Sequence, residues 1–124
     1  MEYENTPVES TTATQGLVID RIFTKPELSV YDMIEYDNRN STIRNPDGSV
    51  VFDMQNVEVP TSWSQIATDI LAQKYFRKAG VPEVESENSI KQVVHRLVGC
   101  WTDWGTKFGY FNSTKVSKSF YEEM

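Results

Sequence analysis

Apolar residues recur at helical spacing in the stretch that begins at Trp63. They keep the i, i+3, i+4, i+7 period that places side chains on one face of an α-helix, and they are Trp63, Ile66, Ala67, Ile70, Leu71 and Tyr75. Ser62 is expected to cap the first turn, with Gln65 as its capping-box partner. Gly80 and Pro82 follow, and both residue types favour the end of a helix. The pattern therefore predicts an amphipathic helix that ends before Gly80.

The same period returns from Ile90 to Phe108. Its apolar positions are Ile90, Val93, Val94, Leu97, Val98, Trp101, Trp104 or Gly105, and Phe108, and Gly109 then stops the run. The short connection through Gly80 and Pro82 would join the two helices side by side. We therefore expect an antiparallel helical hairpin at the centre of the molecule.

Alternating and β-branched runs before Trp63 predict a small β-element. Residues 17–24 read as a strand that ends at Lys25-Pro26, because proline gives a sheet no N–H. Residues 34–44 and 49–54 read as the two arms of a hairpin. Asn45-Pro46-Asp47-Gly48 supplies the turn between them, with Gly48 suited to a left-handed backbone.

The two ends of the chain differ in pattern. Residues 1–16 are polar and acidic with little to bury, so we expect a disordered tail before a folded α+β domain over residues 17–124. A third helix is predicted to begin at Ser113 or Thr114, with Val116, Phe120 and Tyr121 on one face. No capping signal ends it, so we expect that helix to be truncated and the chain to be a piece of a longer protein.

Composition limits the classes of partner. The 124 residues carry a net charge of −6 with a pI near 4.7, which argues against a nucleic-acid or anionic-membrane binder, since both need a basic face. No apolar run approaches the roughly 20 residues that span a bilayer. A lone cysteine, Cys100, and a polar N-terminus fit a reducing compartment without a signal peptide, so we predict a cytoplasmic protein.

The residues alone predict no catalytic, cofactor-binding or metal site. His95 is the one histidine, and it has no set of companion ligands at metal-binding spacing. Cys100 lies in mid-helix, where nothing lowers a thiol pKa, so we interpret it as a small apolar side chain. Lys74, Arg77 and Lys78 cluster near the end of the first predicted helix; interaction with that helix terminus is favoured over a phosphate site. No phosphate-binding glycine loop is present.

Several longer phrases resemble one enzyme family. They are G-L-V-I-D-R-I-F-T-K-P at residues 16–26, V-V-F-D-M-Q-N-V-E-V-P at 50–60, P-T-S-W-S-Q-I-A-T-D-I-L-A-Q-K-Y-F-R at 60–77 and W-T-D-W-G-T-K-F-G-Y-F at 101–111. In this order and spacing they are similar to the N-terminal region of adenosylcobalamin-dependent, class II ribonucleotide reductase. That family's catalytic cysteines, α/β barrel and cobalamin pocket have no matching motif here. The resemblance thus implies adenosylcobalamin in the full enzyme and none bound by this chain.

Two functions from different classes follow. One is a structural or assembly domain of a ribonucleotide reductase, either part of the enzyme chain or a separate subunit that binds a barrel-containing catalytic subunit. The other is an adaptor that kept the fold for protein–protein contact; nucleotide-binding regulation is a weaker third. The residues expected to build the helical core are Trp63, Ile66, Ile70, Val94, Leu97, Trp101 and Trp104. Phe120 and Tyr121 are expected to face the rest of the enzyme.

Overall fold

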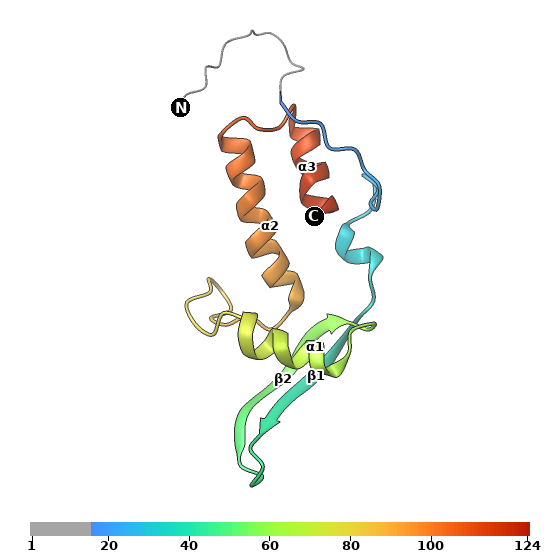
Figure 1. Ribbon diagram of the computed structural model, residues 1–124. Helices are drawn as coiled ribbons and strands as arrows, with labels where there is room; N and C mark the ends of the chain where they lie inside the picture. The colour runs from blue at the N-terminus through green and yellow to red at the C-terminus, as the bar shows by residue number, and fades with distance from the viewer. Residues whose placement is uncertain (1–15) are drawn as a thin grey trace. The chain divides into compact units, whose positions relative to one another are not determined.

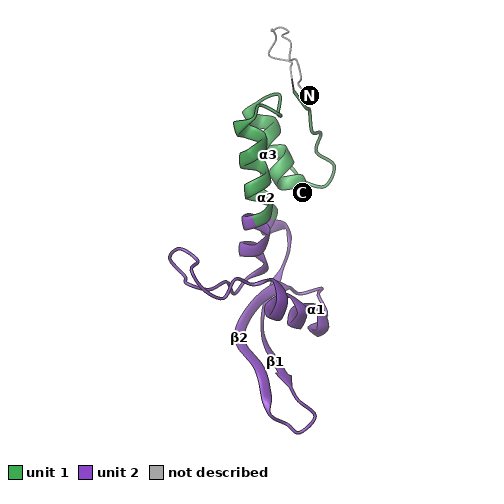
Figure 2. Ribbon diagram, turned by 60° about the vertical axis from the view of Figure 1, so that its left-hand side comes forward, with its two compact units in different colours: residues 1–30, 97–124 green, residues 31–96 purple. Residues whose placement is uncertain are grey.

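The chain folds as an α+β structure in the computed structural model, which describes residues 16–124 (Figure 1). Except for Gly16, the tail expected over residues 1–16 lies outside the described residues. The elements are η2 (Val30–Met33), β1 (Tyr36–Arg44), β2 (Val50–Pro60), α1 (Gln65–Ile70), η3 (Leu71–Tyr75), α2 (Ile90–Lys107) and α3 (Thr114–Glu123). They form two compact units, one of residues 1–30 with 97–124 (unit 1) and one of residues 31–96 (unit 2), coloured separately in Figure 2.

Strands β1 and β2 pair in antiparallel fashion as the predicted hairpin. The turn is the predicted one: the Gly48 amide donates to the Asn45 carbonyl oxygen at 2.9 Å, and Gly48 has φ of +91°. Glycine tolerates that left-handed backbone without a steric cost. β1 begins two residues later than the predicted arm, whereas β2 continues beyond the predicted end to Pro60.

A bulge in β2 explains why its second half was missed. Arg39 pairs with Val57 but Ser41 pairs with Met54, so β2 carries one extra residue across that interval. Asn56 absorbs it with φ of +57°, a conformation that asparagine adopts more readily than most residues. The shift changes which residues of β2 point toward the core, from even-numbered residues before the bulge to odd-numbered residues after it. Phe52, Met54, Val57 and Val59 consequently all contribute to one core, although no simple alternation connects them.

The first predicted helix is shorter than expected, and its buried face is different. Ser64 caps it, because its side chain accepts from the Ala67 amide, so the expected Ser62 cap is wrong. After six residues α1 passes into η3, a π-helix. The buried positions are Thr68, Leu71, Ala72 and Phe76, whereas Ile66, Ile70 and Tyr75 are exposed. Of the predicted apolar stripe, Leu71 is buried and Trp63 and Ala67 are half-buried, so the prediction is wrong for Ile66, Ile70 and Tyr75.

Thr68 explains that error physically. Its hydroxyl donates to the Ser64 carbonyl oxygen at 3.0 Å and accepts from the Arg39 guanidinium at 3.0 Å. Arg39 also donates to the Trp63 carbonyl oxygen at 2.6 Å. A polar residue therefore occupies the buried face with its hydrogen bonds satisfied, an outcome that hydrophobic period alone does not predict.

The core of unit 2 joins these helical segments to the hairpin. Its buried members are Val57, Val59, Leu71, Ala72, Phe76 and Val93, with Phe52, Met54, Trp63 and Ile90 packed against them. α1 contacts β1 and η3 contacts β2. The expected antiparallel helical hairpin is therefore wrong: the first helix is too short to form one, and it packs on the strands instead.

Unit 1 contains the later part of α2, all of α3 and the segment from Gly16 to Val30. α2 ends where predicted, with Gly109 at φ of +70° just beyond it, and Ser113 caps α3 by accepting from the Val116 amide at 3.3 Å. The strand predicted for residues 17–24 is wrong. Only Leu17 makes a β-bridge, to Phe111, and no neighbouring strand extends that pairing among the described residues.

Candidate functional site: an assembly surface

The C-terminal half of α2 presents large apolar side chains to solvent. Leu97, Trp101, Trp104 and Phe108 recur at intervals of four, three and four residues, which places them along one face of the helix. Their exposed fractions lie between 41% and 68%. The buried positions of this part of the helix are Val98 and Gly105. We call the four exposed residues the α2 apolar stripe.

The structure therefore divides the predicted core residues. Trp63 and Val94 are half-buried, and Trp63 packs against the core of unit 2. The expectation of a buried core position is wrong for the remaining five, which are exposed: Ile66, Ile70, Leu97, Trp101 and Trp104. Helical period identifies an apolar stripe but not what covers it, and α2 carries apolar residues on more than one side. A role for these residues at an interface stays a prediction.

The residues expected to face the rest of the enzyme lie on α3. Phe120 is half-buried and its ring lies 5.2 Å from that of Phe111, centroid to centroid, in a tilted contact. Tyr121 is half-buried beside it. Phe120 therefore contributes to packing within unit 1, and an outward role for either residue stays a prediction.

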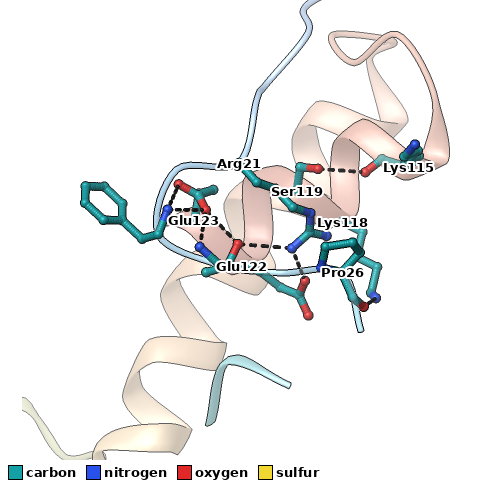
Figure 3. A network of polar contacts seen from close by, with 9 residues as sticks. Arg21, Pro26, Lys115, Lys118, Ser119, Glu122 and Glu123 are labelled. Carbon is teal, nitrogen blue, oxygen red and sulfur yellow. Dashed lines mark hydrogen bonds and ion pairs between the residues drawn. The ribbon is translucent and has the colours of Figure 1, made fainter. Parts of the chain in front are cut away.

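The segment of residues 21–26, which we call the strap, is fastened to the end of α3 (Figure 3). Glu123 accepts from the Thr24 hydroxyl at 2.6 Å, from the Thr24 amide at 2.8 Å and from the Phe23 amide at 3.1 Å. Arg21 forms an ion pair with Glu122 at 2.7 Å, and both side chains are almost buried. One carboxylate thus binds consecutive backbone N–H groups, which form a small anion-binding nest.

These contacts also set the charge state of Glu123. The hydrogen bond from the Thr24 hydroxyl favours the charged carboxylate, and the backbone amides of the strap add to it. They outweigh desolvation, so the pKa of Glu123 lies below its ordinary value of 4.5. The carboxylate is ionised at neutral pH, where the strap contacts are at full strength.

A second buried carboxylate lies in unit 2. Glu87 accepts from the Arg96 guanidinium at 3.0 and 3.1 Å and from the Arg77 amide at 2.8 Å. Burial raises the pKa of Glu87, but the hydrogen bonds from Arg96 and Arg77 outweigh it and leave the pKa below 4.5. The Arg96 guanidinium also donates to the Tyr75 carbonyl oxygen at 3.0 Å. The group joins the 77–87 loop, η3 and the start of α2, which is a structural role.

A cavity of about 480 Å³ adjoins this carboxylate, lined in part by Arg77, Pro82, His95 and Arg96. Pockets for drug-sized ligands measure roughly 300–1,000 Å³, and a cobalamin is larger than that class. The cavity therefore does not fit a corrinoid. Among residues 16–124 there is no cluster of three or more His, Cys, Asp or Glu side chains placed to hold a metal ion.

The remaining candidate residues do not converge. His95 and Cys100 are both exposed positions on α2. Lys78 donates to the Ala72 carbonyl oxygen at 2.6 Å and to that of Gln73 at 3.2 Å, so it satisfies the end of η3 as expected. No helix in the described part of the chain combines the length and apolar character needed to cross a membrane.

What sequence reasoning missed is the strap, because its partner Glu123 lies about a hundred residues away.

Comparison with known proteins gives a consistent result. A family model described as class II vitamin B12-dependent ribonucleotide reductase matches residues 37–124. Three relatives bear the name vitamin B12-dependent ribonucleotide reductase. The one from Bradyrhizobium diazoefficiens is 46% identical over 86% of this chain, that from Agrobacterium fabrum 39% over 86%, and that from Rhodopirellula baltica 35% over 72%. The chain spans only 9–11% of these relatives' length.

Proposed function

This chain belongs to the family of class II, vitamin B12-dependent ribonucleotide reductases, and on that premise we propose that it is the N-terminal assembly domain of such an enzyme. The full enzyme would convert ribonucleotides to deoxyribonucleotides for DNA synthesis. This domain would bind the barrel-containing remainder, either within one polypeptide or as a separate subunit. It would contribute packing and no catalytic group.

The α2 apolar stripe is the observation that carries this proposal. Large contiguous apolar patches on a soluble domain mark interaction sites. Tryptophan, present twice in the stripe, is enriched among the residues that dominate binding energy at interfaces. The Asp103–Lys107 ion pair at 3.0 Å lies on the same stretch of helix, so the nearby charges are already paired and add little net charge to the surface. An apolar face on the partner is the matching chemistry.

The chemistry of the reaction would belong to the remainder of the enzyme. Cobalamin, when bound, supplies radical chemistry. We assign this chain no step, because the family's catalytic motifs have no counterpart in its sequence. Adenosylcobalamin would accordingly be bound by the remainder, as the cofactor of the full enzyme.

Reconstitution tests the proposal. The purified chain is mixed with a polypeptide that carries the rest of the reductase from the same source, and co-elution and ribonucleotide reduction are measured with adenosylcobalamin present. We expect co-elution and a rate that depends on this chain. A Trp104→Ser, Phe108→Ser double variant should weaken binding at least tenfold, whereas Val51→Ser, at an exposed apolar position in β2, serves as the matched control.

The two functions give different outcomes. An assembly domain raises the rate of reduction when it binds. A folded chain that does not bind the remainder, or binds it without any effect on the reaction, would support the adaptor and contradict the proposal.

A further inference from the structure

The strap carries the most exposed large apolar side chains of the described residues. Ile22 is 78% and Phe23 is 75% exposed, and the two are adjacent in sequence. Single exposed apolar residues are common on protein surfaces and need no explanation. This pair differs because its backbone is fixed while its side chains are left in solvent.

The fixing is extensive. Glu123 binds the Phe23 amide at 3.1 Å and the Thr24 amide at 2.8 Å, so the backbone at the exposed pair is tied to α3. On the N-terminal side Arg21 pairs with Glu122 and also donates to the Thr24 hydroxyl at 3.0 Å. On the C-terminal side Lys118 donates to the Pro26 carbonyl oxygen at 3.3 Å, as Figure 3 shows.

Ordering a backbone costs about 1–2 kcal/mol per residue, and here that order does not bury the side chains it positions. A segment that is already ordered binds a partner at a lower entropic cost than a flexible one, which is the physical basis of preorganisation. The contacts of Glu122, Glu123 and Lys118 therefore hold an apolar dipeptide in a form suited to docking.

We propose that Ile22 and Phe23 form a second docking element, positioned by Glu123, that inserts into an apolar pocket of the remainder of the same reductase polypeptide. The inference rests on the proposed function. The occupant is chosen because this chain matches only about a tenth of each full-length relative, which leaves most of that polypeptide available to cover it. Glu123 is a positioning residue, since it acts through the strap backbone.

Hydroxyl-radical footprinting tests this without altering the exposed pair. Side-chain oxidation of Phe23 and Trp104 is measured by mass spectrometry in the 124-residue chain and in the full-length reductase that contains it. The exposed side chain of Tyr75 is measured as an internal reference. We expect oxidation of Phe23 to fall roughly tenfold in the full-length enzyme. Protection of Trp104 reports the α2 apolar stripe and hence the proposed function.

The outcomes separate the two ideas. Protection of Trp104 with unchanged oxidation of Phe23 would overturn the docking element alone. Unchanged oxidation of both residues would overturn the proposed function as well. Protection of Phe23 that grows with concentration in the isolated chain would show that a second copy covers it, which also overturns the choice of occupant.

The positioning role has its own variant. Glu123→Gln in the full-length enzyme should restore oxidation of Phe23 while Trp104 stays protected, because the carboxamide loses the charge that binds the strap amides. Glu27→Gln, at the exposed glutamate that directly follows the strap, is the matched control. Equal protection of Phe23 in the Glu123→Gln variant and the wild type would contradict the role of Glu123.

Discussion

The ring of Phe111 lies directly over Gly105, so close that a side chain at residue 105 has no room. Gly105 is buried within α2, and Phe111 belongs to the connection that leads into α3. The two residues let the chain fold back after α2, and Phe111 also makes the tilted ring contact with Phe120. Glycine is required here for space, not for its backbone conformation.

Gly105→Ala should therefore destabilise the chain. Alanine gains about 0.5–1 kcal/mol in a helix interior, but overpacking typically costs 1–3 kcal/mol, so we expect a net loss of about 1 kcal/mol in urea denaturation. Thr106→Ala, at the exposed neighbouring position, gives only the helix-propensity effect. Equal or greater stability of Gly105→Ala would show that Phe111 moves aside without cost.

Truncating Trp101 should destabilise the chain less than the size of its side chain suggests, because the ring is partly exposed. A fully buried tryptophan would cost about 3–5 kcal/mol on truncation, but Trp101 is 41% exposed. We expect Trp101→Ala to cost roughly half that in the isolated chain, and Leu71→Ala in the core of unit 2 to cost about 2–5 kcal/mol. Chemical denaturation of both variants tests this, and a larger loss for Trp101→Ala would place that ring in a core.

The Glu87–Arg96 pair should be costly to break from one side. Removing one partner of a buried pair destabilises by roughly 3–5 kcal/mol, and because Arg96 keeps 29% of its side chain exposed we expect about 3 kcal/mol for Arg96→Met. The double variant Glu87→Leu, Arg96→Met should recover part of that loss, since no charge then stays unpaired. Additive losses in the double-mutant cycle would show that the two side chains do not interact.

Acid should release the strap through Glu123. Its pKa is lowered in the folded chain, so its contribution is fully present above the unfolded value of 4.5 and is lost as pH falls below it through the folded pKa. The amide NMR shift of Thr24 should follow this titration with a midpoint below 4.5. Glu123→Gln should abolish that titration, and a midpoint at or above 4.5 would contradict the contact.

Local signals in the sequence were sufficient for the features whose cause is local. The Asn45–Gly48 turn, the end of α2 at Gly109 and the Ser113 cap all follow from residues within a few positions of one another. The phase of α1 does not, because Thr68 is held in the buried face by Arg39 from another element. The second half of β2 was hidden by the bulge at Asn56, which breaks the alternation that identifies a strand.

The candidate site likewise combines features that local sequence predicts with features that depend on distant residues. The helical spacing of the apolar residues correctly predicted an apolar face on the second helix, and Trp101 and Trp104 lie on it. Whether such a face is buried depends on what else packs there, which no short-range pattern encodes. The strap depends on an ion pair and hydrogen bonds between residues about a hundred positions apart, so no short sequence motif predicts it.

Unit 1 is built from two separate stretches of the chain, so its contacts form later during synthesis than those of unit 2. Residues 31–96 are contiguous and contain every contact of their own core, so unit 2 has its partners as soon as it leaves the ribosome. Arg21 and Thr24 must wait for Glu122 and Glu123. At translation rates of 5–20 residues per second that delay is roughly 5–20 s, during which the contacts that fix the backbone at Ile22 and Phe23 cannot form.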